Sequence, residues 1–299
     1  MPGPDLVEWA EEIERLGFEI LWYRDHVLWH SPVLDPFTML GAFAVRTSRI
    51  RLGPGVLLVP LRPPAVVAKA VASLDYLSSG RAVLGVGIGG EFPKEFDACG
   101  VPITERGRRM DEAIEVMKAL WTGAPATYKG AFYQVETAVM EPPPIQRPHP
   151  PIWVGGRSDA ALARAGKLGD GWLAHFVTPE GFSKRLEKAV EYWRRRGRSV
   201  ESFRTGLVLY LRIAPTYEEA RREATSYLER EYRQSFEHLV DKYCALGPVS
   251  ECIATIDQYV QAGARHVTVI PACQPSMMMD QLRQVAAEIV PRYGRSSEC

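Results

Sequence analysis

The feature that most constrains the fold is a regular alternation of short apolar segments with amphipathic segments of helical spacing. Seven of the apolar segments are predicted strands, which begin at residues 18, 50, 82, 152, 171, 205 and 266. Strands that are apolar on both faces are typical of a parallel sheet covered by helices. Repeated strand–helix units indicate βαβ crossovers. The alternation therefore predicts an α/β fold.

Two α/β architectures fit this pattern, the TIM (β/α)8-type barrel and the doubly wound sheet. A barrel has eight strands and commonly about 250 residues or more, whereas a doubly wound sheet usually has fewer units around a switch point. We favour the barrel for this chain of 299 residues. Only five residues precede the first predicted helix, Leu6–Leu16, so we expect the first barrel strand to be missing from this chain.

One interruption separates the two halves of the alternation. A small hairpin is predicted over Thr127–Val135, and a connector rich in proline follows over Pro142–Pro151. Connectors of this composition are stiff and extended. No shift of composition marks a domain boundary. We therefore expect a single barrel domain over residues 1–299, with an insertion at about 123–151.

Charge and cysteine content exclude several classes of protein. Lys+Arg and Asp+Glu number 36 each, and a net charge of zero argues against a nucleic-acid or anionic-membrane binder. Five irregularly spaced cysteines favour a reducing compartment over a disulfide framework or a zinc site. The first residues lack the basic and apolar runs of a secretory signal, and no uncharged stretch reaches the ~18 residues of a membrane span. We therefore expect a cytoplasmic protein.

In a parallel barrel, chemistry is expected at the carboxyl ends of the strands. The first predicted strand ends at Arg24-Asp25-His26, where a histidine follows a carboxylate. Histidine exchanges a proton near neutral pH, and a carboxylate can set its tautomer or bind a ligand amide. The alternative is a polar loop in which Asp25 caps the next turn. His175 ends a later strand, where a purely structural role is the competing interpretation.

Two glycine-rich segments are unusual for buried strands. Glycine weakens a strand unless the backbone must bend or another group must approach it closely. The segment Gly53–Leu58 therefore predicts either a bulge facing a flat ligand or a large side chain packed against glycine. Residues 85–90 match G-x-G-x-x-G, but no helix opens at Gly90 and no acidic residue ends a second strand about 20 residues later. We reject a dinucleotide site there and expect a glycine strand end that lines a pocket.

Gly155-Gly156-Arg157-Ser158 joins a predicted strand to a predicted helix. Backbone N–H groups at a helix N-terminus bind anions, and glycine lets a phosphate approach closely. The alternative is an ordinary turn with Ser158 as the N-cap. The sequence contains no H-x-H or H-E-x-x-H motif and no G-x-S-x-G elbow, so we expect no metal site and no nucleophile elbow.

Several motifs occur together in a fixed order. They are Leu16-Gly17-Phe18 with Asp25-His26, Arg49–Gly53, Leu74–Arg81 with Leu84–Gly87, Glu105-Arg106-Gly107, Pro148–Gly156 and Gly169–Trp172. In this order and at these spacings, they resemble the luciferase-like family of flavin- and F420-dependent oxidoreductases. The resemblance covers roughly residues 5–290.

The resemblance implies a (β/α)8 barrel that binds FMN or the 5-deazaflavin coenzyme F420. It implies that His26 lies beside the reacting carbon, as the catalytic acid or as a ligand of the substrate. It also implies a non-prolyl cis peptide between Gly55 and Val56 that packs against the ring. The residues implied to contact the cofactor are Asp25 at the ring, Gly55 and Val56 at the cis peptide, Gly87, Ile88 and Gly89 along the tail, Gly155 and Gly156 at the phosphate, and His175.

The sequence departs from the family pattern in its active-site loops. A glutamate that some F420-dependent members carry after the glycine strand aligns with Gly90, and Glu91 stands one place further on. The basic ligands that glucose-6-phosphate-specific members use for the sugar phosphate are not evident after His175. We therefore do not expect that substrate.

The short chain and the Asp25-His26 context resemble the F420-dependent branch, so we expect hydride transfer between F420 and a small organic substrate. The first alternative is an FMN-dependent monooxygenase that uses reduced flavin and O2. The others are a non-catalytic flavin-binding protein and a metal-dependent hydrolase built on Asp25, His26 and His175. We also expect a homo-oligomer with no nucleic-acid or membrane partner.

Overall fold

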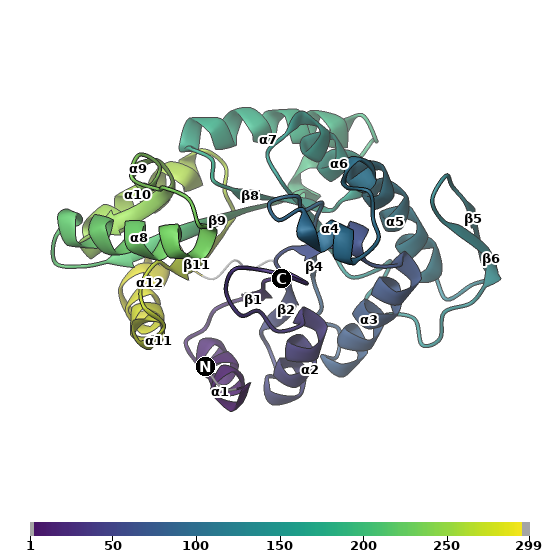
Figure 1. The fold of residues 1–299 in the computed structure, drawn as a ribbon, viewed down its shortest axis with the longest axis horizontal. Helices are drawn as coiled ribbons and strands as arrows, with labels where there is room; N and C mark the ends of the chain where they lie inside the picture. The colour runs from purple at the N-terminus through teal and green to yellow at the C-terminus, as the bar shows by residue number, and fades with distance from the viewer. Residues whose placement is uncertain (1–2, 295–299) are drawn as a thin grey trace.

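The structure, a computed structural model, describes residues 3–294 (Figure 1). Its strands are β1 Ile20–Tyr23, β2 Arg51–Pro54, β3 Leu57–Leu58, β4 Leu84–Gly87, β5 Ala126–Lys129, β6 Gln134–Ala138, β7 Ile152–Gly155, β8 Gly171–His175, β9 Arg204–Ile213, β10 Cys244–Gly247 and β11 His266–Pro271. Its α-helices are α1 Gly3–Arg15, α2 Pro36–Arg46, α3 Pro64–Leu77, α4 Lys94–Ala98, α5 Arg106–Leu120, α6 Asp159–Leu168, α7 Pro179–Arg194, α8 Tyr217–Tyr232, α9 Val240–Tyr243, α10 Val249–Gln261, α11 Pro275–Gln284 and α12 Val290–Tyr293.

The strands form the inner layer of an α/β barrel, and the helices surround them (Figure 1). Every described strand pair is parallel except the hairpin of β5 and β6. Hydrogen bonds run in the order β3-β4-β7-β8-β9. β10 and β11 also pair with β9, on opposite edges. β1 pairs with β2, and a bridge between Leu52 and Ala82 joins these two strands to the segment before β4.

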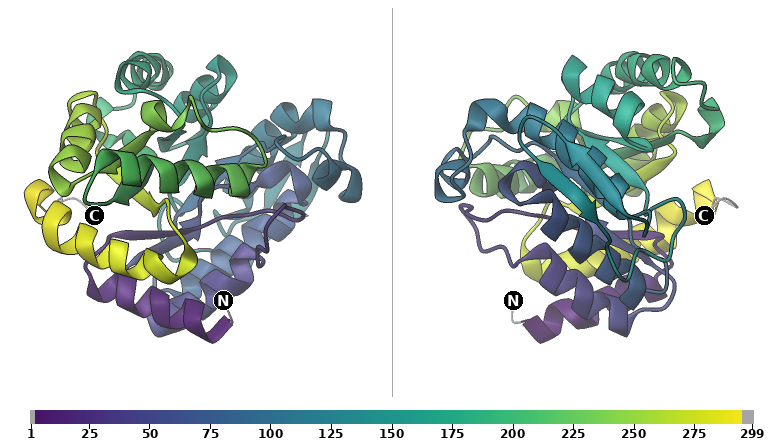
Figure 2. Two further views of the ribbon diagram at one scale, coloured as in Figure 1. Left: turned by 60° about the vertical axis from the view of Figure 1, so that its left-hand side comes forward. Right: turned by 90° about the vertical axis from the view of Figure 1, so that its right-hand side faces the viewer.

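Side chains of α11 and β11 meet those of the first elements of the chain. α1 and α11 lie close together (Figure 2), and Arg283 Nε of α11 donates to Glu12 Oε1 of α1 at 3.1 Å. His266 Nδ1 at the start of β11 lies 3.7 Å from Oε2 of Glu19, just before β1. Among residues 3–294, β1 and β11 form no ladder with each other. The described chain begins with helix α1, and no strand precedes this helix among residues 3–294.

The seven predicted strands are all present, but β10 was not predicted. β10 has only four residues, none of them β-branched, and it lies directly between a short helix and Pro248. Such a segment carries little strand propensity of its own. The strand predicted from residue 50 is divided into β2 and β3 by a cis peptide between Gly55 and Val56, which confirms the kink implied there. The predicted hairpin is confirmed as β5 and β6, which lie outside the ring of helices (Figure 2).

The segment Leu74–Arg81 has a structural role in this protein. Asp75 is fully buried, and its carboxylate accepts hydrogen bonds from the backbone N–H and the side-chain amide of Gln146, at 2.9 and 2.6 Å. The guanidinium of Arg81 donates to the carbonyls of Ile50 and Ala44 at 2.7 and 2.9 Å. Buried charged groups are stable only with such partners. The motif thus ties the connector and α2 to the barrel.

Side chains fill the interior of the barrel. Trp22 and Trp153 pack with ring centroids 5.7 Å apart, and Val83 and Leu173 belong to the same cluster as Trp153. TIM barrels are packed cores rather than pores. A ligand must therefore bind at the mouth formed by the loops after the strands.

Within residues 3–294, no helix has both the length and the apolar character needed to cross a bilayer. Four cysteines are free thiols there, and Cys299 lies outside the described residues.

Candidate active site

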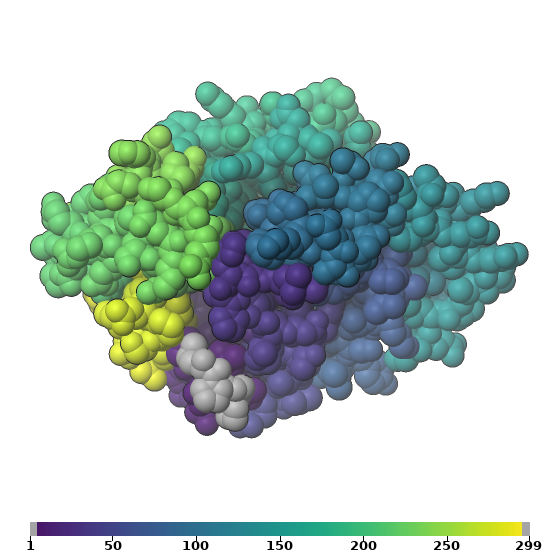
Figure 3. Space-filling model, in the orientation of Figure 1, coloured from purple at the N-terminus to yellow at the C-terminus, as the bar shows by residue number. Residues whose placement is uncertain are grey.

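Three segments far apart in the sequence meet at the carboxyl ends of the strands. They are the loop 24–34 after β1, the segment 88–98 that includes α4, and the last turn of α8. In the space-filling view, the purple N-terminal segment lies between the green of the α8 region and the blue of the α4 region (Figure 3). Because parallel strands bring their carboxyl ends to one face, the segments that follow β1 and β4 can converge there. The end of α8 meets them through contacts of Glu231.

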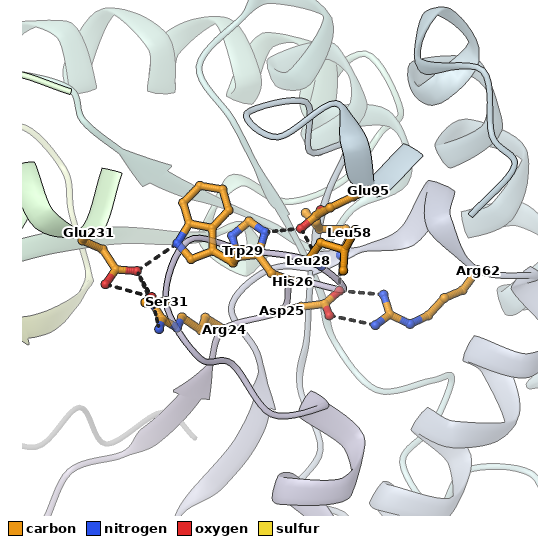
Figure 4. Close-up of polar contacts among 10 residues, drawn as sticks. All are labelled: Arg24, Asp25, His26, Leu28, Trp29, Ser31, Leu58, Arg62, Glu95 and Glu231. Carbon is orange, nitrogen blue, oxygen red and sulfur yellow. Dashed lines mark hydrogen bonds and ion pairs between the residues drawn. The ribbon is translucent and has the colours of Figure 1, made fainter. Parts of the chain in front are cut away.

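Asp25 is held by a buried ion pair. Its carboxylate oxygens accept from Arg62 Nη1 and Nη2 at 2.7 and 2.8 Å, and Oδ2 also accepts from Leu58 N at 2.8 Å (Figure 4). The Asp25 side chain is 0% exposed and that of Arg62 is 18% exposed. The carboxylate therefore secures the loop after β1 to the segment that follows the cis peptide. A contact of Asp25 with the cofactor ring stays a prediction.

His26 forms a hydrogen bond with a second buried acid, Glu95 of α4. The distance from His26 Nδ1 to Glu95 Oε1 is 2.8 Å, and the same oxygen accepts from Leu28 N at 3.3 Å (Figure 4). Burial lowers the pKa of His26 to about 4, with a smaller contribution in the same direction from Arg24. Burial also raises the pKa of the Glu95 carboxyl to about 7. Both shifts favour the neutral forms of the two groups.

Glu95 was not among the residues predicted from the sequence. Gly90 and Glu91 were the positions compared with the family glutamate, but Glu91 is exposed whereas Glu95 is 1% exposed. The available signal was an acid beside Phe96 in a short helix, and both residues are buried. The contact joins residues 69 positions apart, so it depends on the path of the loop and not on local pattern.

Trp29 lies flat against His26. The two ring centroids are 3.9 Å apart, and the ring planes differ by 18°. The indole Nε1 of Trp29 donates to Oε1 of Glu231, in the last turn of α8, at 3.0 Å. Ser31 and Arg24 donate to the same carboxylate (Figure 4). Neither Trp29 nor Glu231 was predicted from the sequence, because nothing local connects a tryptophan in one loop with an acid near the end of a distant helix.

The glycines near the cis peptide make room for Val56. A Cβ atom on Gly87 would lie 2.4 Å from Val56 Cγ2, and one on Gly155 would lie 3.0 Å from Val56 Cγ1. A Cβ on Gly55 would lie 2.8 Å from the Cβ of Trp22. The packing interpretation of these glycines is therefore supported by the geometry. A cofactor contact at Gly55, Val56, Gly87 or Gly155 stays a prediction.

Ile88 and Gly89, which were also predicted to contact the cofactor, lie beside the same mouth. Ile88 follows β4 and is partly buried. Gly89 follows it with φ of +61°, in the left-handed region that favours glycine. A Cβ there would lie 3.3 Å from Leu58 Cδ2. Both residues are in place to line a bound molecule, and that role stays a prediction.

The turn after β7 has the features of an anion site. Gly156 has φ of +113°, and Ser158 caps α6 by accepting from Ala161 N at 3.3 Å. α6 has ten residues, so its N-terminus presents backbone N–H groups and the positive end of the helix dipole. Arg157 is exposed at this turn and donates from Nη1 to the carbonyl of Phe176 at 2.8 Å. Both the N-cap and the anion interpretations are compatible with this geometry.

His175 carries a buried ring nitrogen that has no partner in the described part of the chain. It ends β8, and its Nε2 is buried without a hydrogen-bond partner among residues 3–294. Burial lowers the pKa of His175 to about 4, and Arg157 adds to that effect. A buried polar atom without a partner is costly. A bound molecule with a polar group at this point would satisfy it, so the residues fit a polar cofactor.

The described residues do not support a metal centre. Residues 3–294 contain no group of three or more His, Cys, Asp and Glu side chains arranged to hold an ion. Asp25 is bonded to Arg62 and His26 to Glu95. The hydrolase alternative built on Asp25, His26 and His175 therefore has no ligand cluster in this part of the chain.

Fold and site together define a parallel α/β barrel with a histidine–carboxylate pair at its mouth. Residues 2–266 match the family described as luciferase-like monooxygenase, and the chain belongs to that family. An uncharacterised protein of Mycobacterium bovis is 38% identical over 158 residues, which are 53% of this chain and 54% of that protein. The chain thus aligns with about half the length of this relative.

Two further proteins are similar over nearly the whole chain. An F420-dependent glucose-6-phosphate dehydrogenase of Amycolatopsis mediterranei is 28% identical, and the alignment covers 89% of this chain and 88% of that one. The crystal structure of monooxygenase RslO1 from Streptomyces bottropensis superposes with a TM-score of 0.86 at 26% identity, and covers 98% of this chain and 94% of that one.

Proposed function

We propose that this protein is an F420-dependent oxidoreductase that transfers hydride between the coenzyme and a small organic substrate. The observation that carries the proposal is the His26–Glu95 pair at the mouth of a luciferase-like barrel. The similarity to an F420-dependent dehydrogenase over most of both chains supports the choice of coenzyme. We further propose that the protein acts in the cytoplasm as a homo-oligomer and binds neither nucleic acid nor membranes.

Residues at the mouth have the chemistry to hold F420. The N-terminus of α6 and the backbone of Gly155 and Gly156 would bind its phosphate, and the unpartnered Nε2 of His175 would hydrogen bond to a polar group. Val56 would pack against the ring system. When bound, the coenzyme supplies a ring that accepts or donates a hydride. The protein orients this ring, binds the substrate and excludes water.

His26 is suited to handle the proton that accompanies hydride transfer. Below the Glu95 pKa of about 7, the neutral carboxyl donates to Nδ1 of His26, and the ring proton resides on Nε2. Above that pH, Nδ1–H donates to the carboxylate, and Nε2 carries a lone pair. When Nε2–H of His26 gives its proton to a substrate oxygen, the Glu95 proton passes to Nδ1, so the imidazole stays neutral and the carboxylate is left ionised. Proton transfer from the substrate to Nε2 follows the same path in reverse. The protonation state of Glu95 therefore decides which of the two directions His26 supports.

A second candidate is an FMN-dependent monooxygenase that uses reduced flavin and O2. The similarity to monooxygenase RslO1, in both sequence and fold, favours it. The two candidates differ in the fate of O2. Turnover that consumes oxygen in proportion to product supports the monooxygenase, and turnover that proceeds equally well without oxygen supports hydride transfer.

Cofactor identification tests the proposal first. Protein purified from a host that makes both FMN and F420 is denatured, and the released small molecules are identified by mass. We expect F420 at a stoichiometry near one per chain, or saturable uptake of added F420 by the cofactor-free protein. Steady turnover with a panel of alcohols and enones must then depend on His26. Binding without any turnover would support the non-catalytic alternative.

A further inference from the structure

The carboxylate of Glu231 connects two elements at the mouth. It lies in the last turn of α8, and its side chain is only 14% exposed. Oε1 accepts from the indole Nε1 of Trp29 at 3.0 Å and from Ser31 Oγ at 3.1 Å, and Arg24 forms an ion pair with it (Figure 4). All three donors belong to the loop after β1. Glu231 is therefore the point at which α8 holds that loop.

The last turn of α8 is itself anchored to the barrel. The hydroxyl of Tyr232 lies 2.8 Å from that of Tyr210, a residue of β9 that is 5% exposed. The ring of Tyr232 meets Trp29 edge to face, with centroids 6.3 Å apart at 86°. Aromatic pairs favour this geometry. The acceptor offered to Trp29 thus comes from a platform attached to the central sheet.

Trp29 transmits this restraint to His26. The indole is stacked on the imidazole, and its N–H points away from the stack toward Glu231 (Figure 4). A flat stack restrains tilting of the imidazole but leaves it free to slide, whereas the hydrogen bond to Glu231 limits the slide of the indole. Glu95 restrains the same imidazole through Nδ1. His26 is therefore restrained in its plane by Glu95 and across its face by Trp29.

We infer that Glu231 is a positioning residue for His26, which acts by accepting the Trp29 indole N–H and so holding the indole against the imidazole. The inference rests on the proposed function in one respect, because His26 must be the residue that handles the substrate proton. The competing role for Glu231 is to neutralise Arg24 and close the loop without influence on His26. The two roles predict different results for substitutions that separate the hydrogen bond from the charge.

NMR of the protein without cofactor separates these roles. The six histidines are labelled with 13C, and the signal of His26 is assigned by its loss in His26→Gln. Stacking on an indole moves the ring protons of His26 upfield. Glu231→Leu removes the acceptor, so we expect these protons to move downfield, toward the positions of an unstacked histidine. Glu231→Gln keeps a carbonyl oxygen for the indole N–H but loses the charge, so we expect the upfield position to be retained.

Glu229→Ala is the matched control on the same helix. Glu229 accepts from Phe236 N at 3.1 Å, and its carboxylate supports the segment after α8 without bonding to Trp29. We expect the His26 signals to stay in place in this variant, while the other five histidine signals report whether each variant is folded. Unmoved His26 signals in Glu231→Leu, or equal shifts in Glu231→Gln and Glu231→Leu, would overturn the inference. If Glu231→Leu does not fold, the comparison of Glu231→Gln with wild type still decides, since a lost stack there excludes the acceptor role.

Kinetics distinguishes failure of this inference from failure of the proposed function. With F420 and an accepted substrate, we expect Glu231→Leu to lower kcat roughly ten- to hundred-fold through misplacement of His26, with little change in F420 affinity. Glu231→Gln should recover most of kcat. A shift of the His26 signals combined with full activity of His26→Gln would refute the catalytic role of His26 and leave the positioning geometry intact.

Discussion

Substitution of Asp25 by asparagine tests the ion pair that secures the loop after β1. The Asp25 carboxylate is 0% exposed and accepts two hydrogen bonds from Arg62 and one from Leu58 N, all between 2.7 and 2.8 Å. Removal of one partner of a buried pair costs about 3–5 kcal/mol, because the other charge stays buried. Arg62 keeps 18% exposure and has Asp35 at 3.9 Å, so we expect the low end, about 3 kcal/mol.

Urea unfolding followed by circular dichroism measures this loss. We expect a lower midpoint with an unchanged slope. Arg62→Met is the matched substitution at the other partner, and the double variant completes a thermodynamic cycle. Because the two side chains bond to each other, the double variant should be less destabilised than the sum of the single variants, by about 2–3 kcal/mol. Additive losses, or a loss below about 1 kcal/mol in Asp25→Asn, would refute the buried-pair interpretation.

Three further predictions concern other parts of the molecule. Glu95→Gln should abolish the inflection near pH 7 that we expect in the 15N chemical shifts of His26, because burial raises the pKa of Glu95 to about 7. An inflection that persists in this variant would show that it does not arise from the Glu95 carboxyl. The carboxylate of Glu14 in α1 accepts hydrogen bonds from the backbone N–H groups of Ser48, Arg49 and Ile50, at 2.7 to 3.1 Å. Burial alone would raise the pKa of Glu14, but these donors outweigh it and hold the pKa at about 2. This carboxylate thus stabilises the fold above pH 4.5 and loses that effect as pH falls toward 2. Glu14→Gln should cost about 1–2 kcal/mol at pH 7 and flatten the acid limb of stability between pH 2 and 4.5, measured by urea unfolding. Gly87→Ala should lower the free energy of unfolding by about 1–3 kcal/mol, because its Cβ would lie 2.4 Å from Val56 Cγ2. Val56→Ala should restore part of this stability in the double variant. A double variant without that gain would show that the loss does not come from a clash with Val56.

The fold class was predictable from the sequence because strands that are buried on both faces appear as runs of apolar residues. β10, at 244–247, has only four small or apolar residues, and it was not predicted. His26 was identified by its place after a strand, whereas Glu95 and Glu231 were not, since their contacts depend on how distant loops approach. The glycines were recognised as unusual. Only the structure showed that the side chain of Val56 occupies the space beside them.

We propose that the mouth of this barrel binds F420 and presents His26 to the substrate. Equilibrium titration of cofactor-free protein with F420 and with FMN, followed by fluorescence, tests it most directly. We expect saturable binding of F420, weaker binding of FMN, and loss of F420 affinity in Gly156→Ala, where φ of +113° disfavours a side chain. Tight binding of FMN without binding of F420, or no binding of either, would contradict the claim.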